Sequence, residues 1–191
     1  DYLDLEGNPA IWKERGYAAC ENDYDARGNW QEGRYYDDEG NLILRKDLGY
    51  AIVKNGYDDY GRMSFQYYYG TQEEAVISTK YHCAGYEYEY DANGNQLSMK
   101  YIGLDGNPMV RRDLGYAQER CEYDKKGNRT DLQYLGTDGN PMVRQDLGYA
   151  QAHYEYDGMG NQIVTSYFDA EGNPAIGKEG GYATYTSSYD A

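Results

Sequence analysis

A period of 33 residues runs through the whole sequence. The phrase Tyr-Asp-x-x-Gly begins at Tyr24 and recurs at Tyr57, Tyr90, Tyr123 and Tyr156, with a last Tyr-Asp at Tyr189. Two further phrases, Gly-Asn-Pro and Gly-Tyr-Ala, follow at the same step. A chain that repeats one unit in this way predicts a stack of equivalent elements, because no single unit can bury its own apolar face.

The period divides the chain into the repeats 24–56, 57–89, 90–122, 123–155 and 156–188, with partial repeats at 1–23 and 189–191. Both ends fall within a repeat. We therefore interpret residues 1–191 as a single repeat array, a piece of a longer protein.

The third copy departs from the others. Its second phrase reads Gly-Thr-Gln-Glu-Glu-Ala at 70–75, and His82 and Cys83 replace the Gly-Tyr pair. No further metal ligands stand at a matching spacing. We interpret this copy as a decayed repeat and expect its amide hydrogens to exchange fastest near 70–84.

The repeated phrases predict β-hairpins. In the first turn, Asp25 can accept a hydrogen bond from an N–H two residues on, and Gly28 can adopt the left-handed conformation of a type I turn with a bulge. Stretches such as 51–58 and 62–69 have strand length and strand composition, and no window sustains a helical period. We predict an all-β fold, with two or three short strands per 33-residue β-hairpin repeat, stacked into an elongated or superhelical solenoid-like sheet. A closed propeller is the alternative architecture.

Comparison between copies identifies the expected core. Two columns are always tyrosine, one at 2, 35, 68, 101, 134 and 167, the other at 24, 57, 90, 123, 156 and 189. A third column is always alanine, from Ala18 to Ala183, and a fourth is always aliphatic, at 11, 44, 77, 110, 143 and 176. We expect cross-strand packing of the tyrosine and aliphatic columns to hold neighbouring repeats together, with the alanines where two backbones approach.

Charge and motifs exclude several function classes. A net charge of −15 opposes binding to nucleic acid or anionic lipid, and no apolar stretch is long enough to insert into a membrane. The three cysteines lack metal-binding spacing, and the chain has no nucleophile elbow, phosphate loop or zinc signature. We expect a protein that is not an enzyme and has no cofactor. Calcium at the Asp-Gly loops is the alternative, although turn chemistry accounts for the same residues.

The hairpin phrase, with its Tyr-x-Tyr-Asp approach at 86–95 and 153–161, resembles the YD repeats of the RHS family. The match covers the hairpin and not the whole repeat, because here the second turn continues toward Gly-Tyr-Ala. The resemblance implies hairpins coiled into an extended or shell-like sheet. It also implies a scaffold or container in a large bacterial surface or secreted protein, with no catalytic residues in the repeats.

From this we expect a non-enzymatic structural or adhesive module of a larger surface or secreted protein, located outside the cell. Two alternatives remain open: a module that binds carbohydrate or cell-wall material, and a scaffold for protein partners. Besides the other repeats, a neutral polysaccharide or a protein is the expected partner. Tyrosines that vary between copies are the candidate ligand-binding residues, since packing fixes a position and recognition varies it. They are Tyr36, Tyr67, Tyr69, Tyr86, Tyr88, Tyr154 and Tyr185.

Overall fold

The computed structural model describes residues 1–190, and all of the regular secondary structure in that range is β-strand. The strands are β1 (Ala19–Tyr24), β2 (Trp30–Tyr36), β3 (Ile52–Tyr57), β4 (Met63–Tyr69), β5 (Gly85–Tyr90), β6 (Gln96–Ile102), β7 (Gln118–Tyr123), β8 (Arg129–Leu135), β9 (Gln151–Tyr156), β10 (Gln162–Phe168) and β11 (Thr184–Thr186). Equivalent strands start 33 residues apart, with two strands in each full repeat. The predicted all-β fold is confirmed.

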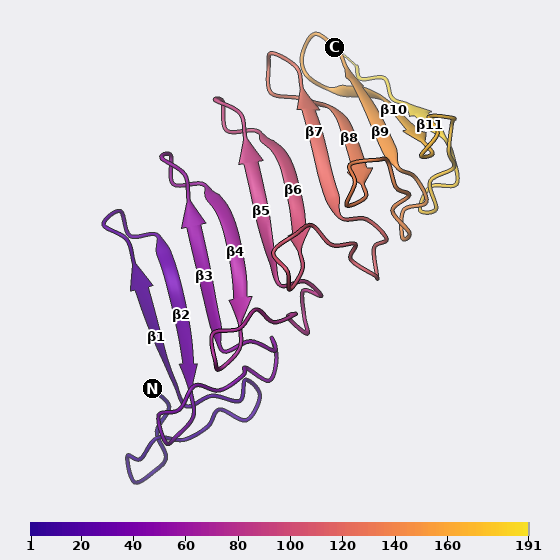
Figure 1. Ribbon diagram of the computed structural model, residues 1–191. Helices are drawn as coiled ribbons and strands as arrows, with labels where there is room; N and C mark the ends of the chain where they lie inside the picture. Colours follow the sequence, from indigo (N-terminus) through magenta and orange to yellow (C-terminus); the bar gives the residue numbers. More distant parts are fainter. Residues whose placement is uncertain (191) are drawn as a thin grey trace. The chain divides into compact units, whose positions relative to one another are not determined.

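The chain forms two compact units. The first comprises Asp1–Glu87 and Ile102–Asn107, and the second comprises Tyr88–Tyr101 and the residues from Pro108 onward. In the first unit β1 to β4 and the start of β5 pair in chain order, and in the second unit β6 to β11 do the same (Figure 1). All of these pairs are antiparallel, so each unit is an open meander.

The hairpin turns have the geometry that their sequence predicts. Asp25 Oδ1 accepts hydrogen bonds from the backbone N–H of Arg27, at 2.9 Å, and of Asn29, at 2.8 Å. Gly28 has φ of 85°, and a bulge follows in the pairing of β1 with β2. The carboxylate thus replaces backbone acceptors that a tight turn cannot supply.

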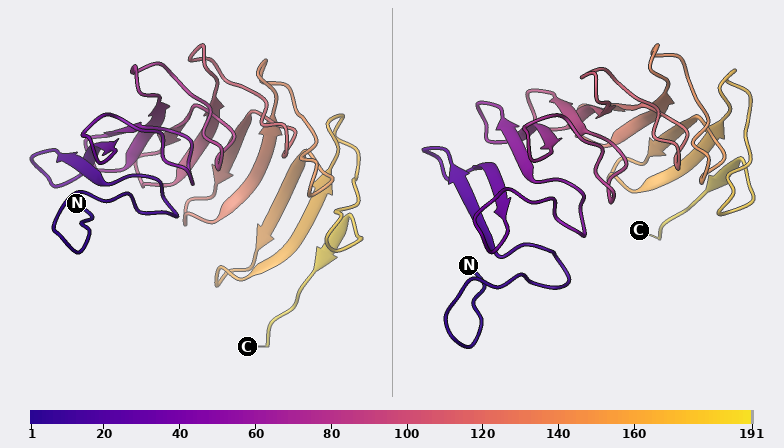
Figure 2. Two further views of the ribbon diagram at one scale, coloured as in Figure 1. Left: turned by 90° about the horizontal axis from the view of Figure 1, so that it is seen from below. Right: turned by 60° about the horizontal axis from the view of Figure 1, so that its bottom comes forward.

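The longer connection after each hairpin lies on one side of the strands (Figure 2). It returns to the sheet through Gly-Tyr-Ala, where Tyr35 donates its N–H to the Ala51 carbonyl at 3.0 Å. Successive connections are also bonded to each other, for example Lys46 N–H to the Arg15 carbonyl at 2.9 Å. Neighbouring repeats are therefore joined both at the strands and at the loops.

The core is a ladder of tyrosine rings between the sheet and these connections. In the first unit the ring centroids of Tyr17, Tyr35, Tyr50 and Tyr68 follow one another at 4.9, 6.2 and 4.7 Å. Strand tyrosines from the first predicted column alternate with tyrosines of Gly-Tyr-Ala, a column that the sequence analysis did not assign to the core. Each buried ring removes ~150–250 Å² from water, which stabilises the stack by a few kcal/mol at ~25 cal/mol per Å².

The second unit repeats this ladder. Its rings lie at 4.7, 6.0 and 4.3 Å in the order Tyr116, Tyr134, Tyr149 and Tyr167. The alanine column is buried from Ala18 to Ala150, as predicted. Each of these alanines also bonds through its backbone to a neighbouring strand, as Ala51 N–H does to the Tyr69 carbonyl at 2.8 Å.

The prediction that the aliphatic column is internal is wrong. Leu44 is 47% exposed and Ile176 is 66% exposed. The next residue explains this, because the Arg45 guanidinium lies over the Tyr35 ring, 4.7 Å from its centroid, and side chains alternate along an extended segment. Arg144 makes the same contact with Tyr134 at 5.2 Å, which turns Val143 outward. A cation over the ring face therefore occupies the place predicted for an aliphatic chain.

The second tyrosine column is half-buried at Tyr57, Tyr90, Tyr123 and Tyr156 and exposed at Tyr24 and Tyr189, so it is not internal. Its hydroxyl groups donate to backbone carbonyls of the preceding hairpin, as Tyr57 does to Trp30 at 3.0 Å and Tyr123 to Gln96 at 2.9 Å. Tyr156 and Tyr189 repeat the bond. This column joins neighbouring hairpins by hydrogen bonds and not by ring burial alone.

In the third copy, other side chains make the contacts that the sequence suggested were lost. Cys83 and Ser78 are completely buried, and Ser78 Oγ donates to the Leu48 carbonyl at 2.7 Å. Glu74 reaches back over Gly70, and its carboxylate accepts the N–H of Gln72 at 2.9 Å, the bond that Asp37 makes with Glu39 in the second copy. The interpretation as a decayed repeat does not fit this packing.

Candidate binding surface

The structure brings only some of the variable tyrosines together. Tyr36, Tyr67 and Tyr69 lie in the first unit on the sheet face that is opposite to the ring ladder. Tyr86 also lies in the first unit, but its ring meets the edge of Tyr68 in the ladder, with centroids 6.4 Å apart. The remaining three belong to the second unit: Tyr88, Tyr154 and Tyr185.

The two variable tyrosines beyond β8 have different surroundings. Tyr154 is half-buried, with the Arg129 guanidinium 5.3 Å from its ring centroid. Tyr185 is exposed, and its ring contacts Tyr182 at 5.8 Å. Neither belongs to an aromatic group on the face opposite to the ladder, so the seven residues do not form one surface.

The open face of the first unit, formed by residues that pair across β2 to β5, carries the densest group of candidate residues. Strand register places Lys54 between Glu32 of β2 and Tyr67 of β4. Phe65 pairs with Gly56 on one side and with Glu87 on the other. Sequence reasoning missed Phe65, because it considered tyrosine alone.

Two rings on this face lie over glycines of the neighbouring strands. An added Cβ would lie 2.0 Å from a ring carbon of Phe65 at Gly56, and 2.4 Å from a ring carbon of Tyr67 at Gly85. The glycines leave room for the rings to lie close to the sheet. Phe65 and Tyr67 are nearly parallel, with an interplanar angle of 19° and centroids 4.8 Å apart.

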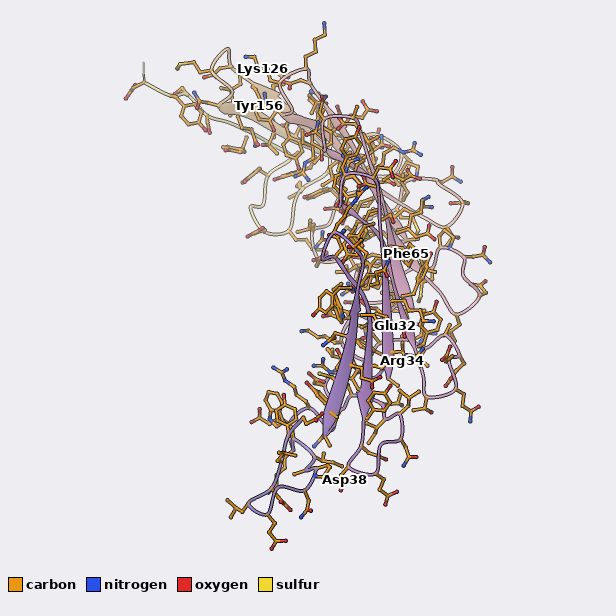
Figure 3. The ribbon with its side chains drawn as sticks, turned by 90° about the vertical axis from the view of Figure 1, so that its left-hand side faces the viewer. Glu32, Arg34, Asp38, Phe65, Lys126 and Tyr156 are labelled. Atoms are coloured by element: carbon orange, nitrogen blue, oxygen red, sulfur yellow. The ribbon has the colours of Figure 1, made fainter. Side chains whose placement is uncertain are left out.

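An ionic network lies beside the rings. Arg34 bonds to Glu32 and, at 3.0 Å, to Glu73, and Lys54 lies 3.5 Å from Glu32 (Figure 3 labels Glu32, Arg34 and Phe65). Burial acts to lower the pKa of Arg34, but the hydrogen bonds to Glu32 and Glu73 outweigh it and hold that pKa above its ordinary value. The network joins β2, β3 and the loop after β4.

Carboxylates also fix two phenol groups of this face. The Tyr67 hydroxyl donates to Glu87 at 2.6 Å, and the Tyr36 hydroxyl donates to Glu21 at 2.7 Å. Burial, together with the Glu87 carboxylate, raises the pKa of Tyr67. Hydrogen bonding to carboxylates thus keeps both phenols protonated and holds their oxygens in place.

Glu73 adopts a conformation that the other copies reserve for glycine. Its φ is 61°, and the equivalent positions are glycines, such as Gly40 with φ of 84° and Gly106 with φ of 76°. A left-handed conformation costs a non-glycine residue ~1–2 kcal/mol. Here the residue that bears this cost supplies a carboxylate to the ionic network.

The corresponding face of the second unit has polar contacts beside Val164 and Phe168 of β10. His153 Nδ1 lies 2.8 Å from Asp131 Oδ1, and Glu89 accepts hydrogen bonds from Ser98 and Lys100. Among residues 1–190, no three His, Cys, Asp or Glu side chains are grouped so that they could hold a metal ion. The turn carboxylates are already occupied by backbone N–H groups, as at Asp25.

Comparisons with known proteins give the fold and no family. No family model matches the sequence, and no curated protein matches it. Among solved structures, the chain is similar to the crystal structure of TcdB2-TccC3-TEV, with a TM-score of 0.51 and 15% identity over 97% of this chain. TcdB2-TccC3 is an RHS/YD-repeat toxin complex. The chain spans only 8% of the length of that structure's chain, so the likeness shows the repeat fold and not the activity of the complex.

No helix within residues 1–190 could span a membrane.

Proposed function

We propose that this chain is a non-enzymatic structural module, a divergent relative of the RHS/YD repeats, within a larger bacterial surface or secreted protein. The tyrosine ladder carries the proposal. Its rings and the hydroxyl-to-carbonyl bonds recur at the 33-residue step, so the tyrosines of both columns are used to join one repeat to the next.

Two further observations support a scaffold. The buried tyrosines are anchored by arginines that bind aspartates, as Arg45, which lies over the Tyr35 ring, binds Asp47 at 2.7 Å. The structural neighbour is itself built from RHS/YD repeats and is part of a larger assembly. The proposed location outside the cell rests on that analogy. The proposal does not involve calcium.

Deletion of one repeat tests the module. Removal of residues 118–150 takes out 33 residues and joins Ala117 to Gln151. Ala117 is the equivalent of Ala150, which normally precedes Gln151, so every column stays in register. A scaffold whose stability is a sum over repeats should still fold, with a lower melting temperature. Removal of 118–134 is the control, because it places strand residues opposite the wrong partners and should abolish cooperative unfolding.

Equal loss of folding in both deletions, measured by circular dichroism during heating, would contradict the repeat module. The location is tested separately, by protease treatment of intact cells that express the full-length protein. If protease added to intact cells leaves the repeats uncut, and the medium contains none of the protein, the protein is neither at the surface nor secreted.

A further inference from the structure

We propose that the open face of the first unit binds a neutral polysaccharide chain, a role that goes beyond the scaffold. The aromatic platform of this site consists of Phe65, Tyr67 and Tyr69, at every second position of β4. Alternate residues of a strand are spaced by ~7 Å on one face. The Phe65 and Tyr67 rings lean together, with centroids 4.8 Å apart, and Tyr69 continues the half-exposed apolar strip along the strand. Such a strip suits an extended ligand made of successive sugar rings.

The platform is not a requirement of the repeat. At the position of Phe65 the neighbouring copies have Glu32 and Ser98, and at the position of Tyr67 they have Arg34 and Lys100. At the position of Tyr69 the preceding copy has Tyr36 and the next has Ile102. Both copies form the same hairpins and the same ladder without rings at the positions of Phe65 and Tyr67. The third copy alone carries all three rings, so packing of the array does not explain them.

The groups beside the platform suit hydroxyl groups. Asp23, Gln31, Glu32 and Lys54 line a shallow groove together with Phe65 and Tyr67. Lys54 and Arg34 supply donors, and Glu32 supplies acceptors, at positions fixed by the ionic network. Sugar hydroxyls both donate and accept hydrogen bonds, so one ligand can use both kinds of group.

Charge decides between ligand classes. Within the network, Arg34 and Lys54 balance Glu32 and Glu73, and the acidic protein around it, at −15 overall, repels anionic polymers. A basic peptide would have to separate these ion pairs before it could bind the carboxylates. A neutral, polyhydroxylated chain leaves these ion pairs intact, and its hydroxyl groups can also donate to the carboxylates of Asp23 and Glu87 beside the rings.

The strained residue Glu73 is the second observation. Its carboxylate fixes Arg34 and lies 3.9 Å from Lys54, at the ~1–2 kcal/mol cost of its left-handed backbone. Strain that the surrounding structure maintains is concentrated at functional sites. Glycine at this position would relieve the strain, so its replacement by Glu73 indicates that the carboxylate has a use other than folding.

The test is binding of the purified chain to polymers. Affinity gel electrophoresis measures binding to polymers in the gel, and calorimetry measures binding to dissolved polymers. Hydroxyethyl cellulose, laminarin and dextran are the neutral probes, and poly-L-lysine and heparin are the charged probes. We expect at least one neutral polymer to bind, with little change between low and high salt, because charge is not the driving force. Tyr67→Ala should weaken that binding by about tenfold, which corresponds to ~1.4 kcal/mol.

Two variants separate binding from stability. Glu73→Gly should raise the melting temperature through relief of strain and still weaken the binding, because Arg34 and Lys54 lose a carboxylate that positions them. Tyr60→Ala is the matched control: Tyr60 belongs to the same repeat, is 76% exposed at the hairpin tip and lies outside the platform. It should leave both stability and binding unchanged.

Failure of every neutral polymer to bind would overturn the proposal, as would binding that survives Tyr67→Ala or Glu73→Gly. Binding to poly-L-lysine alone, lost at high salt, would assign the face to a basic partner instead. A fall in melting temperature without an effect on binding would show that the rings only cover Gly56 and Gly85. These outcomes leave the scaffold proposal unaffected, because its test deletes residues outside the platform.

Discussion

The ring of Tyr81 stacks on the ring of Tyr68, with centroids 5.5 Å apart and planes inclined by 16°. In the other repeats the ring after a strand tyrosine comes from Gly-Tyr-Ala, as Tyr50 follows Tyr35. The third copy has Cys83 at that position, and Tyr81 supplies the ring from two residues earlier. The ladder of the first unit thus continues through a repeat whose sequence has lost the usual tyrosine.

The ladder should be the main source of stability. Tyr68 is completely buried between Tyr50 and Tyr81, and Tyr68→Ala should destabilise the protein by ~3–5 kcal/mol through loss of burial and creation of a cavity. Tyr60→Ala should cost little. Chemical denaturation monitored by fluorescence measures both, and similar losses in the two variants would show that the ladder is not the core.

The third copy should be as well protected as its neighbours. The N–H of Ser78 donates to Cys83 and that of His82 to Ser78, each at 2.9 Å, and these bonds correspond to those of Arg45 and Gly49 in the preceding copy. We therefore expect the amide hydrogens of 78–84 to exchange at rates like those of 45–51. Faster exchange throughout 70–84 in hydrogen-exchange mass spectrometry would restore the sequence-based expectation of a weak joint.

The second tyrosine column should contribute through its hydroxyl groups. Tyr123→Phe keeps the ring and removes the donor to the Gln96 carbonyl, and we expect it to lower the free energy of unfolding by ~1 kcal/mol. Tyr24→Phe is the control, because Tyr24 is 59% exposed at the first hairpin. If thermal denaturation gives the same value for both, the hydroxyl bonds do not couple the hairpins.

Acid should destabilise the turns. Hydrogen bonds from the Asn128 side chain and backbone lower the pKa of Asp124, and those from Asn161 lower the pKa of Asp157 in the same way, both from an ordinary value of 3.8. A carboxyl with a lowered folded-state pKa stabilises the fold fully above its unfolded pKa, and the contribution disappears as the pH falls through the folded pKa. Melting temperatures should therefore decrease as the pH drops below about 4.

Asp124→Asn, which keeps an acceptor oxygen without a charge, should make this acid decrease smaller. An identical decrease in the variant would show that other carboxylates cause the acid sensitivity.

The cysteines should differ in reactivity. Cys20 is exposed, whereas Cys83 and Cys121 are buried, and burial raises the pKa of the Cys121 thiol. Since the thiolate is the reactive form, we expect Ellman's reagent to modify one thiol rapidly in the native protein and all three after denaturation. Rapid native modification of Cys83 or Cys121, located by peptide mass spectrometry, would show that the loops over the sheet open readily.

The sequence by itself determined the period, the hairpins and the all-β fold. Asp25 and Gly28 specify their turn through hydrogen bonds and a backbone conformation within five residues, so the same motif predicts the same turn wherever it recurs. The first tyrosine column and the alanine column were also predictable, because an invariant position within one chain reports a contact that every copy must make.

The tertiary structure alone decided which side of each segment faces inward. Leu44 looks like core in the sequence, yet Arg45 takes the inner position because its cation can lie on a tyrosine face and its aspartate partner can neutralise it. The same limit applies to the candidate site: Phe65, Lys54 and Glu73 come from segments that only strand pairing brings together. Turn geometry is determined by bonds between residues that are close in sequence. Whether an aliphatic side chain or a cation lies over a tyrosine ring depends on residues in other segments, which only the tertiary structure brings together.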